Sequence, residues 1–134
     1  MTKHRVLSLL IPATVGLASL GAVGAAHAAP LARQVTVAGH CTGTSRSVLQ
    51  ANREDNGTLS VDFSVDMARH RAGVAWKLTL ADNGITFASG TKLTRPDGSL
   101  DFNRRTQPQP GANTISAKAT NASTGETCAV SATV

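Results

Sequence analysis

The chain has 134 residues, with 13 Lys and Arg against 8 Asp and Glu, and a formal net charge of +5 when its four histidines are neutral. Such a length accommodates one domain with a modest hydrophobic core. The mild positive charge is not typical of a nucleic-acid-binding protein.

The N-terminal segment predicts an export signal. A basic start at residues 3–5 precedes an apolar stretch at residues 6–25 and an Ala-His-Ala cleavage pattern that ends at Ala28. We therefore expect a signal peptide over residues 1–28, whose removal leaves a single domain over residues 29–134. That domain has 134 − 28 = 106 residues and keeps 11 basic and 8 acidic side chains, a net charge of +3.

The same apolar stretch has a second interpretation, a retained membrane anchor, because residues 6–25 are long enough to span a bilayer. Pro12 and three glycines weaken such a helix, and the cleavage pattern favours removal. The first cysteine, Cys41, lies well past the apolar stretch, so no lipid attachment is expected. The sequence thus predicts a secreted protein that has no membrane span after cleavage.

Short alternating runs along the rest of the chain predict β-strands. Residues 59–66 and 74–80 alternate between apolar and polar side chains, as expected of strands with one buried face. Asn-Gly and Asp-Gly turn sequences separate such runs. The expected strands cover residues 33–39, 45–52, 57–66, 73–81, 84–91, 98–105, 112–120 and 126–134. We expect an all-β fold, an immunoglobulin-like two-sheet antiparallel sandwich of about seven to eight strands with one disulfide.

The two cysteines, Cys41 and Cys128, lie near the two ends of the expected domain. Cys128 shares the parity of Val130, and Cys41 that of Val35, so both point toward the core if their strands run without a bulge. An exported chain meets an oxidising environment, and we expect the disulfide Cys41–Cys128, which ties the first strand to the last. The alternative is a metal or catalytic thiol, which the lack of a CxxC spacing disfavours.

Trp76 is the only tryptophan, and two roles are open to it. It could be an exposed platform on which a sugar stacks, or a core aromatic. Its parity with Leu78 and Leu80 favours the core. The phenylalanines also lie in inward register, which leaves no exposed aromatic face for a sugar; they are Phe63, Phe87 and Phe102.

His40 and His70 are the two histidines of the expected domain. No nucleophile motif, paired carboxylates or metal-ligand spacing accompanies them. Arg69 and Arg71 flank His70, and two neighbouring cations lower the affinity of an imidazole for a proton or a metal ion. We therefore expect no enzymatic activity, no metal and no cofactor.

Four arginines are candidate anion ligands. Arg69 and Arg71 belong to one expected loop, and Arg104 and Arg105 to the end of an expected strand. If both pairs lie at the same end of the sandwich, they could bind an anion such as a phosphate-bearing wall polymer. The alternative is a solvated loop and a charged strand end that serve solubility.

Several motifs occur together along the chain: VDFSVDMARHRAGVAWKLTL from Val61, then DNG, SGTKLTRPDGSLDFNRR from Ser89, TGETC before the last strand, and Cys41-Thr42-Gly43 at the start of the domain. In these motifs, which cover most of residues 29–134, the chain resembles a family of small secreted actinobacterial proteins of uncharacterised function. The resemblance implies secretion, a single β domain and the Cys41–Cys128 bridge. It implies no catalytic or binding residues. The proline-rich QPQPG at residues 107–111 departs from the family pattern.

The sequence predicts a secreted, non-enzymatic binding or interaction module that associates with the cell envelope. Its expected partner is an anionic cell-wall polymer or another extracellular protein, and not a nucleic acid. One alternative is a secreted structural or accessory protein without a specific ligand. Another is a protease inhibitor, which needs an exposed rigid loop, and QPQPG at residues 107–111 is the one stretch that resembles such a loop.

Overall fold

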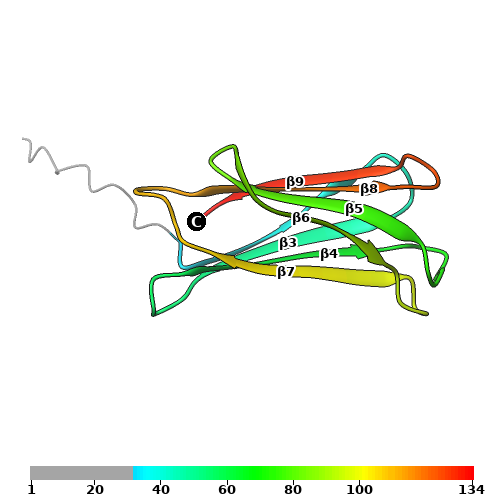
Figure 1. Ribbon diagram of the computed structural model, residues 1–134, viewed down its shortest axis with the longest axis horizontal. Helices are drawn as coiled ribbons and strands as arrows, with labels where there is room; N and C mark the ends of the chain where they lie inside the picture. The colour runs from blue at the N-terminus through cyan, green and yellow to red at the C-terminus, as the bar shows by residue number, and fades with distance from the viewer. Residues whose placement is uncertain (1–31) are drawn as a thin grey trace, which may run out of the picture.

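The computed structural model describes residues 32–134, and the expected signal peptide at residues 1–28 lies outside them. Two antiparallel sheets pack face to face, which confirms the predicted sandwich (Figure 1). One sheet has the strand order β1-β3-β4-β7 and the other the order β2-β9-β8-β5-β6. The strands are β1 (Gln34–Ala38), β2 (His40–Cys41), β3 (Arg46–Arg53), β4 (Leu59–Asp66), β5 (Ala75–Asp82), β6 (Ile85–Leu93), β7 (Ser99–Thr106), β8 (Thr114–Asn121) and β9 (Thr127–Thr133). Within residues 32–134 no helix has the length and apolar character needed to cross a bilayer.

Alternation of apolar and polar residues builds the core between the two sheets. In β4 the side chains of Leu59, Val61, Phe63 and Val65 are all buried, while the Ser and Asp residues between them are not. The inward side chains of β5 meet them from the other sheet, and Trp76 is fully buried. The core interpretation of this tryptophan is therefore confirmed.

The strand predicted over residues 33–39 matches β1, but Cys41 lies on a separate strand, β2, in the other sheet. β1 ends at Ala38, the chain crosses at Gly39, and β2 pairs with β9 in the opposite sheet. A β-carbon at Gly39 would lie 2.3 Å from the Ser47 Oγ, so only glycine leaves room for this crossing. The expectation that Cys41 continues the strand of Val35 was therefore wrong.

The disulfide Cys41–Cys128 is confirmed, although its setting differs from the expected one. Cys41 and Cys128 lie directly opposite each other on the paired strands β2 and β9, with 4.0 Å between their Cα atoms. Both side chains face the core side of that sheet. The bridge therefore joins two neighbouring strands of one sheet and fixes the two-residue strand β2 to the last strand of the domain.

The edge strand β6 departs from the predicted alternation. It pairs with β5 alone, and most of its residues are exposed. Phe87 is only partly buried, and Ile85 and Leu93 have exposed fractions of 64% and 62%. Phe87 thus faces the core as predicted but is less buried than the other phenylalanines. An edge strand receives less cover from the opposite sheet than a central strand does.

Candidate functional site

The structure places the two predicted arginine pairs at opposite ends of the sandwich. Arg69 and Arg71 belong to the β4–β5 loop, which follows the pairing of Asp66 with Ser99, whereas Arg105 pairs with Ser60 at the other end of β4. About six residues of extended strand, roughly 20 Å, separate the two positions. The four arginines therefore do not form one site.

In the arginine pair at the end of β7, Arg104 contacts its own neighbours in the chain. The guanidinium of Arg104 lies 4.2 Å from the centre of the Phe102 ring, and its Nη1 donates to the Asn103 carbonyl. Arg105 is the next residue along the strand and therefore faces the other side of the sheet. Among the residues described, these two arginines line none of the hollows discussed below.

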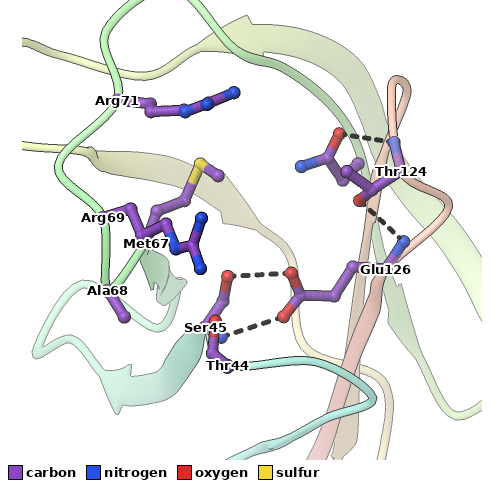
Figure 2. Close-up of a pocket in the computed structure, with 9 residues that line it drawn as sticks. Thr44, Ser45, Met67, Ala68, Arg69, Arg71, Thr124 and Glu126 are labelled. Atoms are coloured by element: carbon purple, nitrogen blue, oxygen red, sulfur yellow. Dashed lines mark hydrogen bonds between the residues drawn. The ribbon is translucent and has the colours of Figure 1, made fainter.

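Arg69 and Arg71 instead line a cavity of about 210 Å³ at their own end of the sandwich. Three connections meet there: the β2–β3 loop, the β4–β5 loop and the β8–β9 turn. Figure 2 shows both arginine side chains extending from the β4–β5 loop toward the wall that carries Thr124 and Glu126. The lining residues are Thr44, Ser45, Met67, Ala68, Arg69, Arg71, Asn121, Thr124 and Glu126.

Hydrogen bonds hold the β4–β5 loop against the neighbouring β6–β7 connection. The Met67 amide donates to the Gly98 carbonyl at 3.0 Å, and the His70 Nδ1 lies 2.7 Å from the Asp97 carbonyl oxygen. Gly98 has a φ of +83°, and a β-carbon there would lie 2.7 Å from the His70 Cα, so no other residue fits this contact. The loop that carries both arginines is thus positioned before any ligand arrives.

The opposite wall of the cavity is fixed by Glu126 and Ser45. The Ser45 backbone amide donates to Glu126 Oε1 at 2.9 Å, and the Ser45 hydroxyl donates to Oε2 at 3.1 Å. A β-carbon at Gly43 would lie 2.6 Å from the Glu126 Cδ, so the glycine leaves room for this carboxylate. These contacts join residues 81 positions apart and set a negative charge across the cavity from the two arginines.

Asn121 supplies a buried hydrogen-bond donor that has no partner. The residue ends β8 and is 1% exposed, and its Oδ1 accepts from the amides of Ser123 and Thr124 at 2.9 and 3.2 Å. Its Nδ2 has no hydrogen-bond partner. Asn121 pairs across the sheet with Trp76, whose Nε1 is also buried and unpartnered. Buried donors nearly always have an acceptor, so the free Nδ2 of Asn121, a residue that lines the cavity, indicates a place where an acceptor binds.

Two further hollows adjoin the cavity and share residues with it. One, of about 270 Å³, lies beside Arg46, Asp66 and His70. The other, of about 410 Å³, lies beside Gly43 and Glu126. All three hollows touch Thr44, so they adjoin one another at this end of the sandwich, and we call them together the groove. The groove offers more room than an isolated ion needs.

Sequence reasoning identified Arg69 and Arg71 but missed the residues that face them. Asn121 begins an Asn-Ala-Ser glycosylation pattern, and its burial shows that it acts as a turn residue. Glu126 and Ser45 carry no sequence signal, because only folding brings the β2–β3 loop to the β8–β9 turn. A polar residue at the inward end of an alternating strand, as Asn121 is, was the one clue available.

The remaining candidate chemical groups are two histidines and a cluster of the two cysteines with Glu126. His40 and His70 are exposed and lie on different elements. Cys41, Cys128 and Glu126 offer ligand atoms within 4.8 Å of one another, but the two sulfurs form the disulfide and are not metal-binding thiolates. In the QPQPG stretch, Gln109 donates from Nε2 to the Asp82 carbonyl at 2.9 Å, so this segment is packed against the domain.

Asp82 gives the domain a pH-dependent stability. The residue is 3% exposed, and burial raises its pKa, although the backbone amide of Gln109 and the charge of Arg53 offset part of the rise. A raised pKa means that stability is fullest below the ordinary value of 3.8 and is lost as the pH rises through the folded-state pKa. We expect Asp82→Asn to leave thermal stability unchanged near pH 3 and to raise the free energy of unfolding by about 1 kcal/mol at pH 7.

Thermal unfolding of both proteins at pH 3 and pH 7 checks this expectation. Asp55→Asn is the matched control, because Asp55 is fully solvated apart from its contact with Arg33. Equal changes at the two pH values would contradict the role of Asp82.

Comparisons with known proteins find no matching family model, no matching curated protein and no matching solved structure.

Proposed function

We propose that the protein is exported and acts, without catalysis, as a binding module for an anionic polymer of the cell envelope. The observation that supports the proposal is the groove at the β4–β5 end, where Arg69 and Arg71 line a cavity together with Asn121, whose buried amide nitrogen has no partner. Guanidinium groups and buried N–H donors are the groups with which proteins hold carboxylates and phosphates.

The fixed position of the β4–β5 loop also supports binding. Its hydrogen bonds to the segment around Gly98 hold the backbone of the loop in place, so little loop entropy has to be lost when a ligand arrives. The three adjoining hollows offer room for more than a single small ion, which favours a chain with repeated anionic groups. A disulfide joins β2 to β9 next to the groove, and a disulfide is stable in the oxidising environment outside the cell.

A pelleting assay with cell envelopes of the producing organism tests the proposal. We expect the protein to sediment with envelopes at low salt and to be released by about 1 M salt, where the Debye length falls to about 3 Å. Substituting both groove arginines, Arg69→Gln with Arg71→Gln, should reduce retention by about tenfold, because each loses a charge-assisted hydrogen bond. The matched control is Arg104→Gln with Arg105→Gln, which removes the same charge from the opposite end.

Equal losses in the two double variants would show that net charge alone drives retention, and the groove would then not be the site. No retention of the wild-type protein would remove the envelope from the proposal and favour a secreted accessory protein without a specific ligand.

A further inference from the structure

The cavity between Arg69, Arg71 and Glu126 has a mixed charge that a simple anion does not match. Two guanidinium groups face it from the β4–β5 loop, and one carboxylate faces it from the β8–β9 turn. Among residues 32–134 the ion pairs are Arg33–Asp55 and Arg95–Asp101, so the charges of the cavity are not paired with each other. An anion bound by the two arginines would also lie near the Glu126 carboxylate, and the two negative charges would repel each other.

Glu126 keeps hydrogen-bonding capacity that faces the cavity. Each of its carboxylate oxygens accepts one bond from Ser45. A carboxylate oxygen has two acceptor positions, so each oxygen can accept one more bond from a ligand. The ligand group that suits this wall is a donor, and a protonated amine suits it best because it also balances the charge.

The donor for the ligand's other end is Asn121. Its Oδ1 is occupied by the amides of Ser123 and Thr124, so the amide orientation is fixed and the nitrogen is the free end. Asn121 has an exposed fraction of 1%, and it lines the cavity. A buried donor with a fixed orientation and no partner selects an acceptor atom, and the arginines nearby favour a charged one.

Resting on the proposed function, we propose that this cavity binds a zwitterionic group, in which an oxyanion lies next to a protonated amine. The oxyanion accepts a hydrogen bond from the Asn121 Nδ2 and faces Arg69 and Arg71, and the amine donates to Glu126. A volume of about 210 Å³ equals about seven water molecules at roughly 30 Å³ each, which accommodates an amino acid or an aminoalkyl phosphate. The oxyanion is a carboxylate or a phosphate, and the experiment below separates the two.

The test is a set of ¹H–¹⁵N NMR titrations of the purified, disulfide-bonded protein at low salt. Phosphoethanolamine is compared with ethyl phosphate, and alanine is compared with propionate, so that each pair differs only by the amine. We expect the amine-bearing probe of at least one pair to bind about tenfold more tightly than its partner, as one added charge-assisted hydrogen bond provides. The pair that shows the difference identifies the oxyanion. Equal affinities within both pairs would overturn the inference.

Two variants locate the two halves of the ligand. Glu126→Gln keeps one oxygen that accepts from the Ser45 amide and gains an NH2 group that can donate to the Ser45 hydroxyl, but it removes the charge. It should abolish the advantage of the amine-bearing probe while the amine-free probe binds as before or better. Glu54→Gln, at the opposite end of the domain, is the charge-matched control and should change neither affinity. An amine advantage that survives Glu126→Gln would overturn the assignment of the amine.

Asn121→Asp retains an oxygen that can accept from Ser123 and Thr124 and replaces the free donor with an acceptor. This variant should bind every probe at least tenfold more weakly than the wild-type protein does. Should this variant fail to fold, the side-chain amide resonances of Asn121 in the wild-type protein give the same information: they should move on saturation with the tighter probe, and their failure to move would overturn the oxyanion assignment.

The outcomes also separate this inference from the proposed function. Envelope retention that depends on Arg69 and Arg71, together with equal affinities for amine-bearing and amine-free probes, overturns the zwitterion and leaves the envelope-binding proposal standing. Tighter binding of an amine-bearing probe without envelope retention supports the zwitterionic cavity and overturns the polymer as its source.

Discussion

Replacing both cysteines, Cys41→Ala with Cys128→Ala, is expected to lower the free energy of unfolding by about 4–5 kcal/mol. The bridge joins residues separated by 87 positions, and in the chain-entropy account a closed loop of that length restricts the unfolded chain by about 4.6 kcal/mol at 25 °C. For a domain of this size the melting temperature should fall by roughly 20 °C or more. Urea unfolding followed by far-UV circular dichroism measures the change.

The loss of the disulfide should also loosen the part of the groove that Ser45 and Glu126 form. β2 has only two residues, and besides the disulfide the pairing with β9 continues through the bonds between Thr42 and Thr127. The β2–β3 loop, which supplies Ser45, follows directly, and Glu126 lies two residues before Cys128. The control is the wild-type protein kept reduced without alkylation, which should lose a similar free energy of unfolding, because alkyl groups on two buried cysteines would overpack the core. A loss below about 1 kcal/mol would show that the unfolded chain is compact without the bridge.

Trp76→Ala is expected to lower the free energy of unfolding by about 3–5 kcal/mol, the usual cost of removing a fully buried large aromatic side chain. Trp76 lies on β5, between β8 and the edge strand β6 of the five-stranded sheet, and pairs with Asn121 of β8. Its removal leaves a cavity beneath the groove. Denaturant unfolding has to be followed by circular dichroism, because the only tryptophan of the chain is lost.

Two controls separate the causes of that loss. Trp76→Phe keeps an aromatic ring and removes the unpartnered N–H, so its cost should stay near 1–2 kcal/mol. Lys77→Ala changes the adjacent exposed residue and should stay within about 0.5 kcal/mol of the wild-type protein. A similar loss in all three variants would point to the β5 backbone and not to the buried ring.

The groove exists because of the way the loops of the two sheets meet. The β4–β5 loop passes from the four-stranded to the five-stranded sheet, and the β2–β3 loop makes the passage in the other direction. The β8–β9 turn lies between them and carries Glu126. A two-sheet sandwich places such crossing loops at its ends, so a rigid scaffold positions variable loops there for binding.

The local pattern of the chain determined the strands, their inward faces and the turns. Alternation in residues 59–66 placed Phe63 and its apolar neighbours in the core. Side chains of a strand alternate between its two faces, and the hydrophobic effect buries the apolar face away from water. The Asn83-Gly84 pair determined the tight turn between β5 and β6, because both residues adopt the positive φ that such a turn requires. The presence of only two cysteines left one pairing, and that pairing is the one found.

Only the tertiary structure decided which strands are neighbours and which loops share an end. The crossing at Gly39 depends on a close contact with Ser47 that no local pattern announces. The distance between Arg69 and Arg105 follows from the antiparallel register of β4 and β7, and register is a property of pairing and not of either strand alone. Glu126 meets Ser45 across 81 residues for the same reason. The sequence alone therefore determined the scaffold through short-range periodicity, while the composition of the groove is a long-range consequence of how the two sheets pack.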